Sequence, residues 1–172
     1  LVSHRSGIAA DGNRLDTTVT TTRDESLYDL QGRLTSSFET VLSGSEPDIA
    51  KTVSVTGIHY DQLDRMTGRT ETVNRATPDG RLNETSDAVF FDAVFDPATG
   101  RQTGYTQTSN SSASPGLLTT TVRSGQTFDR QNRVDSYEEE IRQNGLGLGS
   151  LSHLTRTKTT YKGADQLVGY EE

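Results

Sequence analysis

The stretch Tyr60-Asp61-Gln62-Leu63-Asp64-Arg65-Met66 is one copy of a phrase that occurs five times in the 172 residues of the chain. An aromatic residue and an aspartate open the phrase, and an arginine and an apolar residue close it. The other copies begin at Tyr28, Phe95, Phe128 and Tyr161. The copy at Phe95 ends at Arg101 without the apolar residue, and the last keeps the aromatic head without the aspartate and the arginine. The five heads lie 32, 35, 33 and 33 residues apart. A fixed period of this length predicts a repeat architecture.

Each period has the pattern of two β-strands. Residues 51–60 and 66–75 alternate β-branched and polar side chains, which is the two-residue period of a strand. Residues 61–65 form a short turn, because an aspartate at its head can hydrogen-bond the backbone two residues on. Residues 76–83 form a longer loop around Pro78-Asp79-Gly80. We therefore expect an all-β fold of tandem antiparallel hairpins, with nine or ten strands in an elongated meander or solenoid-like sheet.

The whole chain is expected to form one repeat array. Its predicted parts are a degenerate first half-repeat (1–27), four repeats (28–59, 60–94, 95–127 and 128–160) and an incomplete last repeat (161–172). Only 30% of the residues are hydrophobic and the mean hydropathy is −0.68, which is too little apolar material for a thick core. A thin β-structure in which every unit stacks on the next fits this composition.

The composition also narrows the possible partners. A net charge of −7 and a pI near 5.0 argue against nucleic acid and anionic membranes. The absence of cysteine excludes disulfides, thiolate metal sites and a cysteine nucleophile. No signal peptide and no apolar run of membrane-spanning length is present, so no membrane insertion is expected. We interpret the sequence as a segment of a longer protein or a processed subunit.

The phrase is expected to act mainly as a structural staple, with a ligand-binding role as the alternative. The aspartate that opens each turn can pair with the arginine that closes it, or that arginine can lie on a neighbouring aromatic ring. The staple residues are Tyr28, Asp29, Arg33, Tyr60, Asp61, Arg65, Phe95, Asp96, Arg101, Phe128, Asp129, Arg133 and Tyr161. A second set of aromatic residues, Phe38, Tyr105, Tyr137 and Tyr170, is expected to form a ladder from unit to unit.

The phrases Tyr28-Asp-Leu-Gln-Gly-Arg-Leu-Thr35 and Tyr60-Asp-Gln-Leu-Asp-Arg-Met-Thr-Gly68 resemble those of the YD-repeat, or Rhs-type, family of large bacterial surface and toxin-delivery proteins. The period here is longer than that of the family, and the strands are richer in threonine. Phrases such as Arg65-Met-Thr-Gly68 and Tyr105-Thr-Gln-Thr-Ser109 are closer to the repeat arrays of giant haemagglutinin-like exported proteins. The resemblance implies an extracellular, non-enzymatic β-structural role at the bacterial cell surface, as a filament, stalk or shell.

No residue pattern predicts catalysis or a cofactor. The histidines His4, His59 and His153 are isolated from one another, so a three-histidine metal site is not expected. Residues 11–16 lack the glutamate that would complete a calcium loop, and residues 145–149 lack the Lys-Ser/Thr of a phosphate loop. We expect no catalytic residue, no metal ligand and no cofactor.

Two short triplets match the acceptor pattern for N-glycosylation. They begin at Asn83 and Asn110, in a chain that is rich in serine and threonine. Such triplets also occur by chance, and threonine favours strands without adding apolar surface. The sequence therefore leaves two interpretations open: glycosylation at Asn83 and Asn110, or a chance match in strands that are rich in threonine.

The favoured function is a subunit or segment of an extracellular fibre that assembles head to tail through its edge strands. Its partners are then copies of itself or flanking repeats. One alternative is an adhesin module that binds surface glycans through tyrosine, threonine and asparagine on the sheet. Another is a part of a toxin-encapsulating shell. An enzyme is the least expected class.

Overall fold

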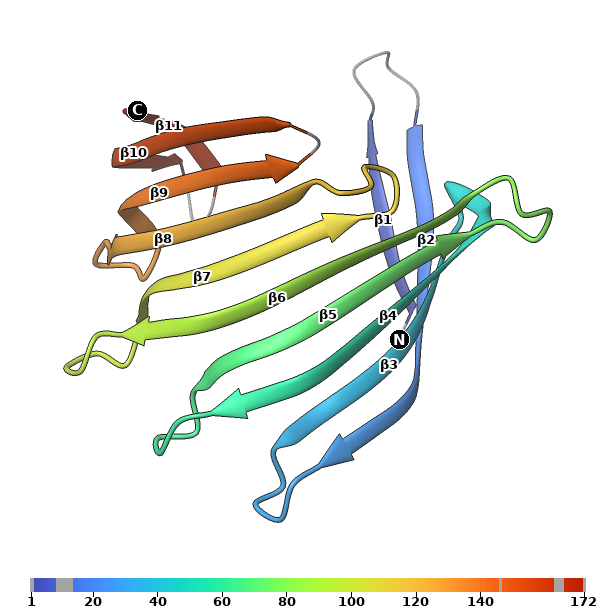
Figure 1. Ribbon diagram of the computed structural model, residues 1–172, viewed down its shortest axis with the longest axis horizontal. Helices are drawn as coiled ribbons and strands as arrows, with labels where there is room; N and C mark the ends of the chain where they lie inside the picture. The colour runs from blue at the N-terminus through green and yellow to red at the C-terminus, as the bar shows by residue number, and fades with distance from the viewer. Residues whose placement is uncertain (1, 9–13, 146, 163–165, 172) are drawn as a thin grey trace. The chain divides into compact units, whose positions relative to one another are not determined.

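The computed structural model describes residues 2–8, 14–145, 147–162 and 166–171. These residues form eleven strands and no helix, in one open antiparallel sheet whose strand order follows the chain (Figure 1). The strands are β1 (Val2–Ile8), β2 (Arg14–Tyr28), β3 (Leu34–Ser43), β4 (Glu46–Tyr60), β5 (Met66–Ala76), β6 (Asn83–Phe95), β7 (Gln102–Ser111), β8 (Leu118–Phe128), β9 (Val134–Gly145), β10 (Leu148–Lys162) and β11 (Gln166–Glu171). The predicted all-β meander of hairpins is confirmed.

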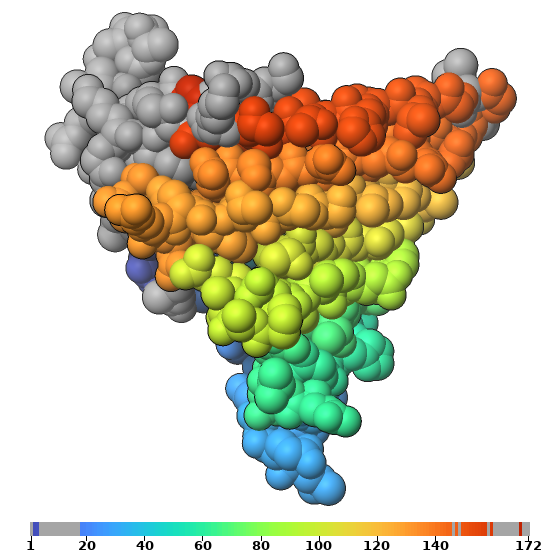
Figure 2. Space-filling view, turned by 90° about the vertical axis from the view of Figure 1, so that its left-hand side faces the viewer, coloured from blue at the N-terminus to red at the C-terminus, as the bar shows by residue number. Residues whose placement is uncertain are grey.

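The chain divides into two units. The first holds Leu1–Ile58, Thr70–Asp87 and Ser111–Ala113, and the second holds His59–Arg69, Ala88–Asn110 and Ser114–Glu172. The second unit contains three consecutive copies of the aromatic–Asp turn, at the same ends of their hairpins (Figure 1). Its residues from Ala88 of β6 through β8, β9 and β10 follow one another as neighbouring bands (Figure 2).

The tight turns alternate with loops at the opposite strand ends, as the sequence indicated. In the loop between β5 and β6, the Thr77 N–H donates to the Leu82 carbonyl at 3.0 Å, and the Gly80 N–H donates to the Thr77 carbonyl at 3.0 Å. The connection between β3 and β4 is much shorter, because β4 already begins at Glu46. Its partner across the turn is Ser43, so only two residues connect β3 to β4.

A β-bulge precedes the aromatic head in several repeats. The register of β2 on β3 shifts between Arg23 and Glu25, and that of β8 on β9 shifts between Ser124 and Thr127. Three residues lie three positions before a head and have positive φ: Gly57 (57°), Asp92 (54°) and Gly125 (61°). Glycine occupies this backbone region without a steric penalty. The bulges in β2 and β8 therefore bend these strands just before they reach their turns.

The sheet buries few side chains. Among the residues whose exposure is described, Ile58 and Tyr137 are the buried hydrophobic ones, and Ser37 is the buried polar one. Large apolar side chains such as Phe38, Leu42 and Leu151 remain exposed. An ordinary domain covers its sheet with a second layer. Here the stability has to come from contacts within the sheet, and the repeated turn supplies many of them.

Candidate functional site: the repeated turn and its stacking contacts

The turn from Tyr60 to Met66 shows how the phrase folds. The Asp61 N–H donates to the Arg65 carbonyl at 3.0 Å, and the Asp64 N–H donates to the Asp61 carbonyl at 3.2 Å. One carboxylate oxygen of Asp61 accepts the N–H groups of Leu63 (2.8 Å) and Arg65 (3.0 Å). The other accepts the Arg65 Nε–H at 2.7 Å. One carboxylate thus holds both the backbone of the turn and the arginine that closes it.

Two further turns repeat this geometry almost atom for atom. Asp29 accepts the N–H of Gln31 and of Arg33, each at 2.9 Å, and the Arg33 Nε–H at 2.7 Å. Asp129 accepts the corresponding groups of Gln131 and Arg133 at 2.8, 2.9 and 2.8 Å. The Asp–Arg pair that the sequence indicated is thus present in these turns, and its two side chains are partly buried.

Each of these turns needs one residue with left-handed backbone. The residues with positive φ at this place are Gly32 (80°), Asp64 (59°) and Asn132 (69°), and Gly100 (70°) has the same role in the remaining described turn. Glycine, asparagine and aspartate are the residues that adopt this conformation most readily. Backbone conformation therefore restricts the phrase at the fourth or fifth position after its aromatic head, while the residues between the aspartate and that position vary.

The turn after Phe95 is one residue longer and uses threonine in place of arginine. Asp96 accepts the N–H of Ala98 at 2.9 Å, the N–H of Thr99 at 2.6 Å and the Thr99 hydroxyl at 2.9 Å. Its backbone is closed by Gly100 N–H to Asp96 carbonyl and Asp96 N–H to Arg101 carbonyl bonds, both 2.8 Å. The extra residue lies within the 33-residue interval between Phe95 and Phe128. With Thr99 bound to Asp96, Arg101 contacts the ring of the next repeat.

Hydrogen bonds hold the pKa of the four turn aspartates below the ordinary value of 3.8. For Asp29 and Asp129 the largest cause is the main-chain N–H of the closing arginine, and for Asp61 it is the guanidinium of that arginine. For Asp96 the largest cause is the N–H of Thr99. Each of these donors favours the ionised carboxylate.

These pKa shifts predict that the protein loses stability in acid. A carboxyl group whose pKa is lower in the folded state contributes stability above its unfolded pKa, and this contribution is lost as the pH falls through the folded pKa. We expect the free energy of unfolding to be nearly constant above about pH 5 and to fall steadily below about pH 4. Urea titrations followed by circular dichroism at each pH measure this.

The double variant D61N/D129N is the control for the acid response. Asparagine keeps an oxygen acceptor for the turn amides and removes the titrating charge. The variant should be less stable than the parent at pH 7, and its stability should depend less on pH between 5 and 3. An unchanged slope in that range would assign the acid response to other carboxylates.

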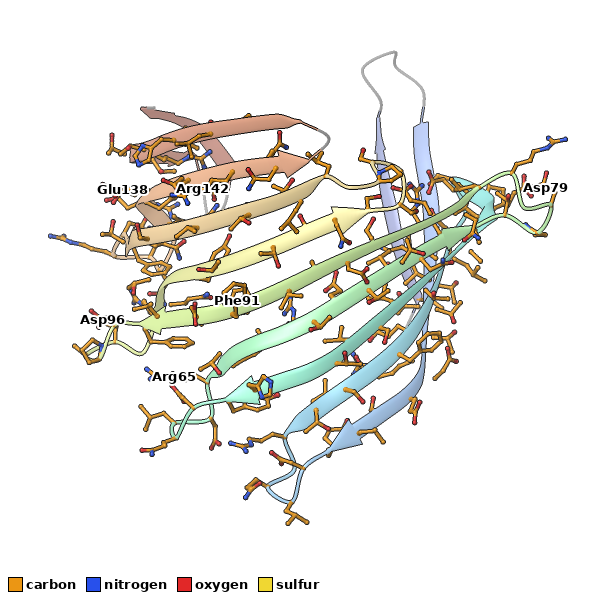
Figure 3. All side chains as sticks on the ribbon, viewed as in Figure 1. Arg65, Asp79, Phe91, Asp96, Glu138 and Arg142 are labelled. Carbon is orange, nitrogen blue, oxygen red and sulfur yellow. The ribbon has the colours of Figure 1, made fainter. Side chains whose placement is uncertain are left out.

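The arginine of one turn lies over the aromatic head of the next. The Arg65 Cζ is 4.4 Å from the centroid of the Phe95 ring, and the Arg101 Cζ is 5.3 Å from that of Phe128. Figure 3 shows Arg65 and Asp96 on adjacent turns. A guanidinium within about 6 Å of a ring centroid is attracted by the negative face of the ring. The phrase therefore holds its own turn through its aspartate and the following repeat through its arginine.

A second ladder of rings and guanidinium groups crosses the sheet from β5 to β10. The Phe90 and Tyr105 ring centroids are 5.2 Å apart, and the Arg123 Cζ is 5.5 Å from the Tyr105 ring and 4.0 Å from the Tyr137 ring. Arg69 continues the ladder at one end, 6.0 Å from the ring of Phe90. Arg156 continues it at the other end, 5.1 Å from the ring of Tyr137.

Arg123 lies at the centre of this ladder. Its guanidinium lies between two tyrosine rings and donates two hydrogen bonds to the Glu139 carboxylate, from Nε at 2.9 Å and from Nη2 at 2.5 Å. The side chains of Arg123 and Glu139 are only 24% and 12% exposed. The sequence interpretation missed the arginines of this ladder. A usable signal was present, because Arg23, Arg123 and Arg156 each stand five residues before an aromatic head.

The expected ladder of second aromatics is partly wrong. Tyr105 and Tyr137 do stack in it, but Phe38 is exposed, and the neighbouring Ser37 is the buried residue. Neighbouring residues in a strand point to opposite faces of the sheet, so a difference of one position moves Phe38 to the other face. The side chains of Tyr161 and Tyr170 lie outside the described part of the structure.

Two shallow hollows lie above small residues of the sheet. One, of about 260 Å³, is lined by Gly104, Val94 and Val122 among others, and the other, of about 220 Å³, lies around Ser136 and includes Glu138. Neither brings two carboxylates together or places a nucleophile beside a histidine. Within the described residues, no three histidine, aspartate or glutamate side chains are grouped to hold a metal ion.

The remaining residues singled out in the sequence are exposed wherever their side chains are described. The described side chains of His59 and His153 are exposed, and that of His4 is outside the described part. Asn83 and Asn110 are both exposed, and the triplets that they open are in contact, because the Thr85 N–H donates to the Ser112 hydroxyl at 2.9 Å. Their glycosylation stays a prediction. The described residues contain no helix that is long and apolar enough to cross a membrane.

The chain matches no protein-family model, no curated protein and no solved structure. The geometry of its own residues is therefore the basis for a function.

Proposed function

We propose that this chain is a non-enzymatic structural β-repeat protein, a subunit or segment of an extracellular fibre on the bacterial surface. The observation that carries the proposal is the contact between repeats, in which Arg65 lies on Phe95 and Arg101 lies on Phe128. Two consecutive repeats thus hold the next one by the same kind of contact, a guanidinium on an aromatic head. A contact that is local and repeated allows an array to grow by adding further units.

The open sheet also favours assembly through its edges. β1 and β11 are the outermost strands in the strand order. The outer side of an edge strand presents backbone N–H and C=O groups that can pair with another strand. Head-to-tail pairing of such edges is heterologous, and when it does not close it produces a filament.

Sedimentation velocity over a concentration series, together with cryo-electron microscopy of the most concentrated sample, tests the proposal. We expect species that grow with concentration into linear oligomers. A monodisperse monomer at every concentration would rule out assembly of this chain by itself. Catalytic turnover of any small substrate by the purified protein would contradict the non-enzymatic part of the proposal.

A further inference from the structure

The two shallow hollows, both in the second unit, are equivalent places in consecutive repeats. The first is lined by Gly104 and the second by Ser136, each of them a small residue one position before a tyrosine of the ladder. The residues that line the second hollow all have a counterpart in the first, at the same position relative to an aromatic head once the extra residue after Phe95 is counted. Such pairs include Thr106 with Glu138 and Val122 with Thr155. The repeat thus produces the same hollow twice.

Both hollows lie on the same face of the sheet. Val122 of the first hollow pairs with Glu140 of β9, and Glu138 of the second hollow is two residues from Glu140 on that strand. Directly paired residues, and residues two positions apart in one strand, share a face. Tyr137 is the neighbour of Glu138, so it lies on the other face, with the ring ladder. The hollows therefore belong to the face opposite to the ladder.

Each hollow has a carboxylate among its lining residues. Asp92 lines the first hollow and Glu138 lines the second, and both residues are exposed. Among the described residues, neither carboxylate takes part in an ion pair or a side-chain hydrogen bond. Glu140, on the same strand and face as Glu138, is instead paired with the Arg142 guanidinium at 2.6 Å. The two carboxylates at the hollows are therefore available to a positively charged ligand, which the net charge of −7 also attracts.

Apolar surface accompanies the carboxylate in the first hollow. Val94 and Val122 both line it, and their side chains are 57% and 38% exposed. In the second hollow Thr155 takes the place of Val122, and its methyl group offers a smaller surface of the same kind. A lysine or arginine side chain lays its methylene stem along apolar surface and keeps its charge in water. Such a side chain therefore fits the wall and the carboxylate of each hollow at once.

The distance between the hollows selects the conformation of the ligand. Thr106 and Val122 of the first hollow pair across β7 and β8, and Glu138 and Thr155 of the second pair across β9 and β10. The hollows are thus two strands apart, which corresponds to roughly 9.6 Å across the sheet. A polyproline II helix presents every third residue on one side, at intervals of roughly 9.3 Å. An extended strand presents same-side residues at roughly 6.7 Å, which does not match this interval.

We propose that this face of the second unit binds a proline-rich basic peptide segment in the polyproline II conformation, with lysine or arginine at every third residue. The segment crosses the strands and places one basic side chain in each hollow, beside Asp92 in the first and Glu138 in the second. A polyproline II helix is already ordered before it binds, so little entropy is lost. One segment that engages both hollows binds more tightly than either contact alone, because the second contact is intramolecular. The partner is a different chain, so this site is independent of the fibre proposal.

Two synthetic peptides of identical composition test the spacing. One consists of four Lys-Pro-Pro units, so that its lysines recur at every third residue. The other consists of two Lys-Pro-Lys-Pro-Pro-Pro units, in which neighbouring lysines are two or four residues apart and cannot enter adjacent hollows together. Fluorescence anisotropy of the labelled peptides at low salt, where exposed charges are least screened, measures both affinities for the full chain. We expect the first peptide to bind roughly two- to fivefold more tightly, which is the effect of one further exposed ion pair.

Charge-removing variants test the two carboxylates. Glu138→Gln and Asp92→Asn each remove one charge, and asparagine tolerates the positive φ of 54° at Asp92. Each variant should bind the Lys-Pro-Pro peptide roughly two- to fivefold more weakly than the parent does, and the double variant should bind both peptides equally. Glu140→Gln is the matched control. It makes the same change two residues from Glu138 but outside both hollows, so the ratio of the two affinities should stay as in the parent.

Three results would overturn the proposal. Equal affinities of the two peptides for the parent would mean that charge alone attracts them. An equal effect of Glu140→Gln and Glu138→Gln would assign the attraction to the acidic surface as a whole. The absence of binding by either peptide would show that the hollows do not take a basic side chain. The comparison of the peptides on the parent needs no variant, so it decides the proposal even where a substitution destabilises the chain.

Discussion

Replacing Arg123 with alanine is expected to lower the free energy of unfolding by about 2–4 kcal/mol. The substitution removes a guanidinium that contacts two tyrosine rings and pairs with Glu139 in a site where both charged side chains are mostly covered. Breaking such a pair leaves a carboxylate with little access to water, which costs more than the pair itself contributes. Urea denaturation followed by circular dichroism measures the difference.

Arg23 provides a matched control within the same chain. It stands 100 residues earlier, at the same position before its head, and pairs with Glu39 as Arg123 pairs with Glu139. Its side chain is 55% exposed, and Ser37 stands where Tyr137 contacts Arg123. Because exposed ion pairs contribute little, Arg23→Ala should cost less than about 1 kcal/mol.

Arg123→Lys distinguishes stacking from charge. Lysine keeps the positive charge, but it has no flat guanidinium to lie between two rings and cannot reproduce the two-hydrogen-bond fork. Its expected stability lies between that of the parent and that of the alanine variant. Equal losses for Arg23→Ala and Arg123→Ala would show that the ring ladder adds nothing to the ion pair.

The sequence predicted those features that depend on neighbours along the chain. Asp61 and Arg65 are four residues apart, so their contact forms within one turn, and the phrase alone indicates it. The alternation of strands follows for the same reason, because a two-residue period needs no knowledge of the partner strand. The contact between repeats was only one of two alternatives that the phrase indicated for its arginine, the other being the pair with the aspartate.

Features that depend on counting residues across a bulge were not predictable from the phrase. Bulges before heads shift the pairing of the incoming strand, as in β2 and β8. The extra residue after Phe95 puts Tyr105 ten positions after its head, whereas Tyr137 stands nine positions after Phe128, and one position exchanges the two faces of the sheet. Phe38 also stands ten positions after its head, but without an extra residue before it, and for this reason it was expected in the ladder and Ser37 was overlooked. Gly57 and Gly125, each three residues before a head, were the available signal for the bulge.

Gly104→Ala is expected to destabilise the protein by about 1–3 kcal/mol. A Cβ at this position in β7 would lie 2.8 Å from the Arg123 carbonyl oxygen and 3.5 Å from the Ser124 Cα of β8. The obstacle is backbone in the interior of the sheet, so no side chain can rotate away. β8 would have to move, and Arg123 would move with it.

Gly149→Ala is the control that separates this clash from the loss of glycine itself. Gly149 lies in β10, and a Cβ there would meet only the Asn144 Oδ1 at the ordinary distance of 3.9 Å. Alanine also restricts the unfolded chain more than glycine does, so Gly149→Ala should leave stability unchanged or raise it by up to about 1 kcal/mol. Urea denaturation of both variants gives the comparison. If the two variants had the same free energy of unfolding, β7 and β8 would be farther apart than in the structure, because the observed spacing leaves no room for a Cβ at Gly104.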